Sequence, residues 1–315
     1  MTAGTSQAVD ATPDDADRRA DASRVGVAPA ADAAAPHVSA PHVSALRVHP
    51  LKSAAPLPLD EAHVDPWGLR GDRRWMLVET DGQMVTARKD PLLLHVTATP
   101  AGGLDEPRLR LAAPGRPALE VTADGTSYLP STIWGADVRG RHVPAADAWL
   151  AEVVGRPVRL LWCDDPQDRQ IDLDHAEPGE TVVYQDGFPL LLTTTASLGL
   201  VQRWVDDAAR EQGTGPVPLT MARFRPNVVV DGALEPLVEQ GWDRVRIGEV
   251  TFRMAKHCGR CVMTTYDPVT LAKTKEPLRS IAAHNTIGGR IVFGVNLVPE
   301  STGTLHLGDP VVPSP

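Results

Sequence analysis

The chain has 315 residues, of which 42% are apolar, enough to bury one large core or two moderate ones. Its net charge of -9 argues against broad binding to nucleic acid, because such binding needs many Lys and Arg side chains to neutralise phosphates. Three cysteines, no apolar run of transmembrane length and no signal-peptide layout predict a cytoplasmic protein with reduced thiols and no membrane partner.

The first 44 residues are rich in Ala and Asp, lack aromatic side chains and run into the tandem repeat APHVSAPHVSA. Such a segment offers too little apolar surface to offset the entropy of ordering it. We therefore expect residues 1–44 to be a disordered tail. After it, short alternating runs separated by turn residues predict strands, and Asp81-Gly82 between RRWMLVET and QMVTAR predicts a hairpin.

Helical periodicity first occurs over residues 145–155 and again over residues 195–213, and both segments end at a glycine. The chain then returns to strand-like runs, which are, in chain order, RPNVVVDG, RVRIGEVTFRMAK, VMTTYDP, GRIVFGVNLVP and TLHLGDPVV. The pattern predicts a β-rich α+β protein in two β-barrel-like halves with a few flanking helices. Turn and helix-stop signals place the boundary between residues 155 and 187.

Cys258 and Cys261 form a Cys-x-x-Cys pair in the stretch MAKHCGRCVMTTYDP. A thioredoxin-type dithiol needs a helix after its first cysteine, whereas VMTTYD predicts a strand. A structural zinc site needs four ligands, and only Cys163 and scattered histidines such as His257 remain. Two interpretations stay open: a pair of buried cysteines that act as small apolar residues, or one thiolate that binds a metal whose other ligands come from a cofactor.

A cofactor that carries a phosphate would need basic and small polar side chains directed at one place. The sequence offers candidates in four short blocks, HPLKS, GDRRW, VTAR and FRPN. For any single basic residue, an ordinary solvated surface charge is the alternative. The candidates are Lys52, Ser53, Arg73, Arg74, Thr86, Arg88, Arg225 and Asn227.

Five separated blocks carry a resemblance to a known family: RVHPLKS, GLRGDRRWMLVETDGQMVTARKDPLL, FRPNVVVDG, WDRVRIGEVTFRMAKHCGRCVMTTYDPVT and FGVNLVPESTGTLHLGDPVV. In this order they resemble the MOSC proteins that have a MOSC N-terminal β-barrel domain, the group of the amidoxime reducing component and its bacterial relatives. The resemblance implies an N-terminal β-barrel domain over residues 45–165 and a MOSC domain over residues 166–315. One departure is KSAAPLPL, where relatives often have Cys-x-Gly after Lys-Ser.

The resemblance further implies an enzyme with a molybdenum cofactor, in which Cys261 binds the metal and takes part in catalysis while Cys258 supports it. The positions that would anchor the cofactor fall on Lys52, Ser53, Arg73, Arg88, Thr194, Arg225 and Asn227. Thr194 has an alternative role as a helix N-cap.

The implied reaction is the reduction of small N-hydroxylated compounds such as amidoximes and hydroxylamines. Because the chain lacks the cysteines that an iron–sulfur cluster would need, we expect a separate electron-donor protein of ferredoxin or flavoprotein type. Asp267 is a candidate for proton relay or support of the site, although an Asp before Pro is also an ordinary turn starter. A different class stays open: a sulfur carrier or cofactor-binding module in molybdenum cofactor sulfuration.

Overall fold

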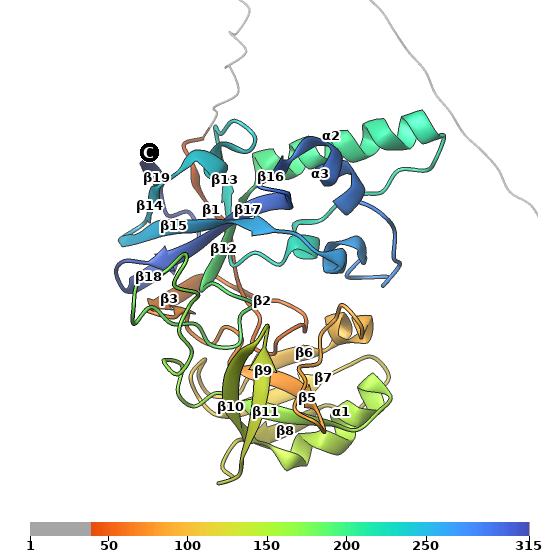
Figure 1. Ribbon diagram of the computed structural model, residues 1–315, viewed down its shortest axis with the longest axis vertical. Helices are drawn as coiled ribbons and strands as arrows, with labels where there is room; N and C mark the ends of the chain where they lie inside the picture. The colour runs from red at the N-terminus through yellow and green to blue at the C-terminus, as the bar shows by residue number, and fades with distance from the viewer. Residues whose placement is uncertain (1–38, 315) are drawn as a thin grey trace, which may run out of the picture. The chain divides into compact units, whose positions relative to one another are not determined.

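The structure is a computed structural model that describes residues 39–314 (Figure 1). Most of the predicted tail lies outside the described residues. Its predicted end at residue 44 is wrong, because strand β1 (His42–Val48) already begins within it. The reason is pairing with a segment that is distant in the sequence. Val43 is buried, and its backbone N–H donates to Asp309 O at 2.9 Å.

The described residues form nineteen strands and three α-helices, so the predicted β-rich α+β class is confirmed. The strands before residue 165 are β1, β2 (Leu57–Leu59), β3 (Glu61–Asp65), β4 (Gly68–Leu69), β5 (Trp75–Glu79), β6 (Thr97–Pro100), β7 (Arg108–Ala112), β8 (Leu119–Thr122), β9 (Tyr128–Ile133), β10 (Ala136–His142) and β11 (Val158–Trp162). The later strands are β12 (Leu190–Thr194), β13 (Val228–Asp231), β14 (Arg244–Ile247), β15 (Val250–Gly259), β16 (Thr286–Ile287), β17 (Arg290–Pro299), β18 (Gly303–His306) and β19 (Val311–Ser314). The helices are α1 (Asp147–Val154), α2 (Thr195–Gln212) and α3 (Leu278–His284).

A nine-stranded sheet dominates the upper part of Figure 1, with the order β19-β14-β15-β17-β12-β13-β1-β2 and β16 paired to β17. A four-stranded sheet, β5-β11-β10-β9, and a three-stranded sheet, β6-β7-β8, form the lower part. None of these sheets of the described chain closes on itself.

The strand partners do not follow the expected division at residue 165. Strand β1 pairs with β13, and β3 pairs with β18, so residues 42–69 join sheets of the C-terminal half. The side chains explain this pairing, since Leu46 and Val48 of β1 enter the same apolar cluster as Val228 and Val230 of β13. An alternating strand reveals its buried face but not its partner strand.

Both faces of the nine-stranded sheet are covered around β13. Val228 and Val230 pack into one cluster, whereas Val229 points to the opposite face and packs with Val201 of α2 and Ile281 of α3. Figure 1 shows these two helices side by side on that face. Since the short run VVV is buried on both sides, it forms a rigid base for the residues that precede it.

Two of the helices match the sequence prediction closely. Helix α1 ends at Gly155 and α2 ends at Gly213, and both glycines adopt the left-handed conformation of a C-cap. Helix α3 was not predicted. Within residues 39–314, no helix combines the length and the apolar character that crossing a membrane would require.

Candidate functional site

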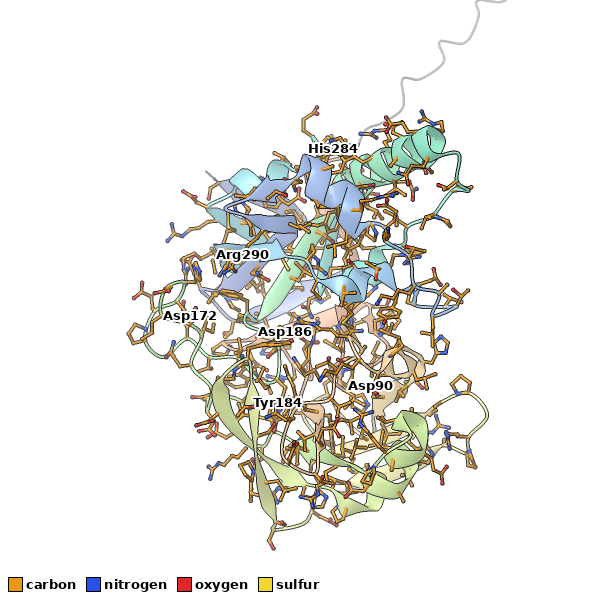
Figure 2. The ribbon with its side chains drawn as sticks, turned by 45° about the vertical axis from the view of Figure 1, so that its right-hand side comes forward. Asp90, Asp172, Tyr184, Asp186, His284 and Arg290 are labelled. Carbon is orange, nitrogen blue, oxygen red and sulfur yellow. The ribbon has the colours of Figure 1, made fainter. Side chains whose placement is uncertain are left out.

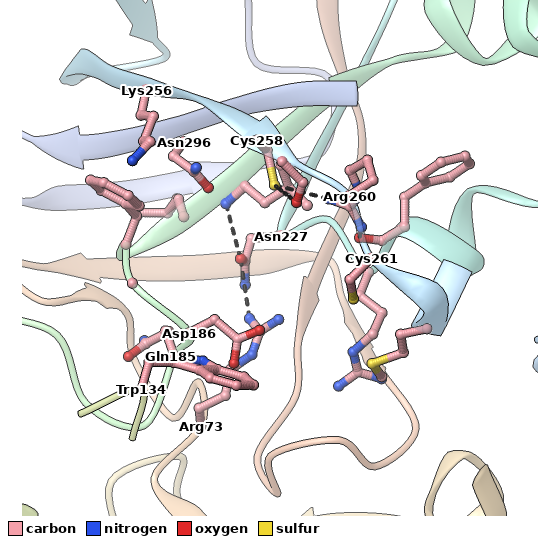
Figure 3. A pocket seen from close by; sticks show the side chains of 18 of the residues that line it. Arg73, Trp134, Gln185, Asp186, Asn227, Lys256, Cys258, Arg260, Cys261 and Asn296 are labelled. Atoms are coloured by element: carbon pink, nitrogen blue, oxygen red, sulfur yellow. Dashed lines mark hydrogen bonds between the residues drawn. The ribbon is translucent and has the colours of Figure 1, made fainter. Parts of the chain in front are cut away.

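A cavity of about 330 Å³ lies between the nine-stranded sheet and the loops of the N-terminal sheets (Figure 3). Its lining comes from the loops after β1 and β5, the β9–β10 turn, the segments before β12 and β13, and strands β15 and β17. In Figure 2, Asp186 of this lining lies between the upper and the lower sheets. Seven of the predicted site residues line this one cavity: Lys52, Ser53, Arg73, Arg88, Arg225, Asn227 and Cys261.

The lining is strongly basic, although the whole chain is acidic. Only one carboxylate of the described residues, Asp186, faces eight Lys and Arg side chains in the lining. A cavity with such an excess of one sign of charge attracts ligands of the opposite sign. The basic residues are Lys52, Arg73, Arg88, Arg223, Arg225, Lys256, Arg260 and Arg290.

Asp186 joins two of the predicted anchors. The buried Lys52 donates from Nζ to Asp186 Oδ1 at 2.5 Å and to Tyr184 O at 2.8 Å, and Arg88 Nη2 donates to Asp186 Oδ2 at 3.3 Å. The charges of Lys52 and Arg88 lower the pKa of Asp186. Trp134 stacks on the Arg88 guanidinium at 4.1 Å and completes this rim of the cavity.

The buried carboxylate of Asp72 forms an ion pair with Arg73. Arg73 Nη1 donates to Asp72 Oδ2 and to Asn227 Oδ1, the latter at 3.2 Å. Burial would raise the pKa of Asp72, yet the charge of Arg73 and the contact with His49 lower it to about 2. The Asn227 amide makes two further hydrogen bonds, because Oδ1 also accepts from Leu191 N at 3.2 Å and Nδ2 donates to Arg47 O at 3.1 Å. Asn227 therefore orients Arg73 within the cavity wall.

Four lining residues have a strained backbone. Ser53, Arg73, Trp134 and Arg225 have φ angles of 70°, 48°, 51° and 57°, the left-handed region that side chains rarely adopt. They account for four of the six non-glycine residues with positive φ in the described chain. Strain of this kind costs on the order of 1–3 kcal/mol each and persists where the surrounding structure imposes it, often at ligand sites.

The positive charge of Arg225 is unfavourable in the protein without a bound ligand. Burial and the neighbouring charges of Arg73 and Arg260 lower its pKa to about 9, so the fold disfavours its charge. Its Nη1 donates to Ala54 O at 2.6 Å, which does not neutralise that charge.

We expect Arg225→Gln to raise the melting temperature of the ligand-free protein, because it removes a guanidinium whose charge is disfavoured by burial and by the neighbouring Arg73 and Arg260. Each kcal/mol corresponds to roughly 2–4 °C in a protein of this size class. Thermal unfolding followed by circular dichroism measures the shift. A lower melting temperature in the Gln variant would mean that the guanidinium is already compensated.

The two cysteines of the Cys-x-x-Cys pair both line the cavity but differ in their contacts. Cys258 Sγ accepts from Arg260 Nη1 at 2.9 Å, whereas the Cys261 thiol has no hydrogen-bond partner within residues 39–314. The same residues contain no cluster of three or more His, Cys, Asp or Glu side chains that could hold a metal ion. A metal at Cys261 would therefore need ligands from another molecule.

The strand predicted after Cys261 is wrong. Val262–Thr265 form a short 3-10 helix, because the hydroxyls of Thr264 and Thr265 turn back to the carbonyls three residues earlier. These hydrogen bonds, to Cys261 O and Val262 O, measure 3.0 and 2.7 Å. They hold the backbone of Cys261 at the edge of the cavity.

The structure does not bring two of the predicted site residues to the cavity. Thr194 is fully buried, and its Oγ1 accepts from Ser197 N at 3.0 Å. Thr194 is therefore the N-cap of α2, the alternative role that the sequence also offered. Asp267 is a turn residue whose Oδ1 accepts from Val269 N and Thr270 N. Because Asp267 is not part of the lining, it does not occupy the position expected of a proton relay.

Asp267 still acts on the cavity through a lining residue. Its Oδ2 accepts from Arg223 Nη2 at 2.8 Å, and Arg223 is almost completely buried. Two further donor atoms of Arg223, Nε and Nη1, and Nε of Arg260 are buried without any partner in the described residues. Buried donors of this kind need acceptor atoms, and those of a bound ligand would serve.

Sequence reasoning missed several lining residues: Trp134, Gln185, Asp186, Arg223, Lys256 and Arg290. Arg223 lies two residues before the predicted Arg225, and the basic Lys256 lies two residues before Cys258, so both were detectable as neighbours of a motif. Trp134 and Arg290 carry no local signal, because only the arrangement of the sheets brings them to the cavity.

Two family models match this chain. The MOSC N-terminal beta barrel domain matches residues 40–157, and the MOSC domain matches residues 179–312. With this fold and this basic cavity around a cysteine, the chain belongs to the MOSC family.

Within the family, it is similar to mitochondrial amidoxime-reducing component 1 of Danio rerio, with 31% identity over 284 residues that cover 84% of this chain and 82% of that protein. The corresponding human protein is 29% identical over 285 residues, with coverage of 84% and 81%. Molybdenum cofactor sulfurase of Danio rerio is 30% identical over 288 residues, which cover 85% of this chain but 34% of that protein.

Proposed function

We propose that this protein binds a molybdenum cofactor and reduces small N-hydroxylated compounds such as amidoximes, with electrons from a separate donor protein. One observation carries the proposal: the thiol of Cys261, which has no hydrogen-bond partner among residues 39–314, opens into the same cavity as eight basic side chains. A molybdenum cofactor combines a metal, for which a thiolate is a suitable ligand, with an anionic phosphate. The names of the relatives support the same chemistry.

The donor set of the cavity fits this cofactor. Lys52, Arg73, Arg88 and Arg225 would meet its phosphate, and the unpartnered donors of Arg223 and Arg260 would meet its acceptor atoms. Cys261 would bind the metal. When bound, the cofactor would supply the two-electron chemistry that removes oxygen from an N–OH group.

The reaction also needs protons: an amidoxime, two electrons and two protons give an amidine and water. His257 is a lining residue suited to move a proton. Its Nε2 lies 3.0 Å from Gln240 O, which makes Nε2 the donor and leaves Nδ1 as the atom that accepts and releases a proton. This role replaces the one expected of Asp267.

The first test is metal content. Protein purified from a host that makes the molybdenum cofactor is expected to contain about one molybdenum per chain and no stoichiometric zinc, because the described residues offer no cluster of three or more His, Cys, Asp or Glu side chains for zinc. Elemental analysis by mass spectrometry measures both metals. Zinc without molybdenum would overturn the proposal.

A sulfur carrier in cofactor sulfuration is the second candidate, favoured by the similarity to molybdenum cofactor sulfurase and by the accessible position of the Cys261 thiol. The two candidates differ in one assay. We expect holoprotein reduced by a viologen dye to convert benzamidoxime to benzamidine. A carrier would give no turnover and would hold a cyanide-labile sulfur on Cys261 after incubation with a cysteine desulfurase.

A further inference from the structure

A second group of donors lies in the cavity apart from the Cys261 region. Figure 3 shows Lys256 and Asn296 next to each other at one side of the cavity and Cys261 at the opposite side. The two residues are direct cross-strand partners of β15 and β17. Gln185, from the segment before β12, lies apart from this pair in the same view, next to Asp186 and Trp134.

A β-bulge directs Lys256 into the cavity. The pairing of β15 with β17 shifts between Met254, opposite Leu297, and Lys256, opposite Asn296. Two steps along β15 therefore match one step along β17, which changes the face that the following side chains occupy. As a result the four consecutive residues from Lys256 to Gly259 all line the cavity.

The donors of this group have no partners in the described residues. Lys256 and Asn296 make no side-chain hydrogen bond or ion pair there, whereas six of the other seven basic lining residues do. Donors that line a cavity without partners can be satisfied by the acceptor atoms of a bound ligand.

The nearby carboxylate does not neutralise Lys256. Asp186 is the only acidic lining residue of the described chain, and its two oxygens already accept from Lys52 and Arg88. One ammonium and one side-chain amide, on directly paired residues, thus present donors to the same side of the cavity. Such a set suits an oxyanion, which offers several strong acceptors and a negative charge.

We propose that Lys256 and Asn296 form an anion subsite, separate from the Lys52–Arg88 group, that binds a phosphate or carboxylate group of a cavity ligand. The identity of that ligand, which is either the cofactor or an anionic substrate, rests on the proposed function. The ability of the subsite to bind an anion does not depend on the proposed function.

Titration calorimetry with inorganic phosphate tests the subsite in full-length protein from a host that makes no molybdenum cofactor. The wild type is expected to bind two phosphate ions, and Lys256→Met is expected to weaken one of them about tenfold or more by removing a charge-assisted hydrogen bond. Lys256→Arg should retain both within about threefold. The exposed Lys275, outside the cavity lining, gives the matched control: Lys275→Met should bind phosphate as the wild type does.

Phosphate binding that is identical in Lys256→Met and the wild type would overturn the proposal. So would equal losses in the Lys256→Met and Lys275→Met proteins, which would indicate a general effect of charge. The wild-type result stands even if no molybdenum is found in the holoprotein, so failure of the proposed function and failure of the subsite are distinguishable.

Two readouts on the holoprotein distinguish the sources of the anion. If the cofactor supplies it, Lys256→Met lowers the molybdenum content several-fold. If the substrate supplies it, the molybdenum content is unchanged and the KM for 4-carboxybenzamidoxime rises about tenfold, while the KM for neutral benzamidoxime stays the same. A variant in which neither readout changes would overturn the role of the subsite in ligand binding.

Discussion

Replacing Cys261 with serine is expected to abolish both molybdenum retention and the reduction of benzamidoxime. The thiol lines the cavity without any partner in the described residues, and a serine hydroxyl is a harder and far less acidic ligand than a thiolate. Loss of a residue that merely supports a metal ligand typically costs 10- to 100-fold, so loss of the ligand itself should exceed about 100-fold. Metal analysis and the viologen-coupled assay give the two readouts.

Cys258→Ser is the matched control for this experiment. Cys258 Sγ accepts from Arg260 Nη1 at 2.9 Å, and a serine hydroxyl can accept the same hydrogen bond. The control should therefore keep most of the activity and most of the metal. Equal losses in both variants, together with a reversible disulfide on oxidation, would mean that the pair acts as a dithiol.

Asp72→Asn is expected to destabilise the fold by about 3–5 kcal/mol, which is the cost of leaving a buried charge without its partner. The Asp72 side chain is completely buried, accepts from His49 N at 2.7 Å and forms an ion pair with Arg73, which is itself largely buried. Chemical denaturation of the cofactor-free protein measures the loss. Glu300→Gln serves as control, because its ion pair with Arg244 is largely exposed and should contribute less than about 1 kcal/mol.

The pH dependence tests the same contact. The pKa of Asp72 is about 2 in the folded protein, below its ordinary value of 3.8. Its carboxylate therefore stabilises the fold fully above about pH 4, and this contribution, about 2 kcal/mol, is lost as the pH falls from 4 to 2. The Asn variant should lack this part of the acid transition. An acid transition of equal slope in both proteins would contradict the assignment.

Locally determined features could be predicted from the sequence, and those that depend on distant contacts could not. Helix α2 was predictable because its Thr start and Gly213 stop act within a few residues. The Asp81-Gly82 turn was predictable for the same reason, and Gly82 has the expected positive φ of 89°. By contrast, the partner of β1 is set by apolar contacts with β13, almost 200 residues away in the sequence.

The residues of the candidate site show the same difference between features that the local sequence predicts and features that depend on distant contacts. Arg73 and Arg225 belong to motifs that family resemblance identifies, and the structure brings both to one cavity. Lys256 reaches that cavity through a β-bulge, and Trp134 through a two-residue turn in which a bulky side chain adopts a φ of 51°. Neither irregularity has a signature in composition or periodicity. Thr194 illustrates the opposite error, since a hydroxyl in the expected position caps a helix instead.

The pairing of β1 and β3 with β13 and β18 has a consequence for biosynthesis. Residues 42–69 leave the ribosome early, but β13 ends at Asp231 and β18 at His306. At translation rates of roughly 5–20 residues per second, these early strands wait on the order of ten seconds or more for their partners. Lys52 and Ser53 lie between β1 and β2, whereas β17, which also lines the cavity, ends at Pro299, so the cavity can be completed only after β17 has been synthesised. A ligand that needs the complete cavity can therefore bind only after that point.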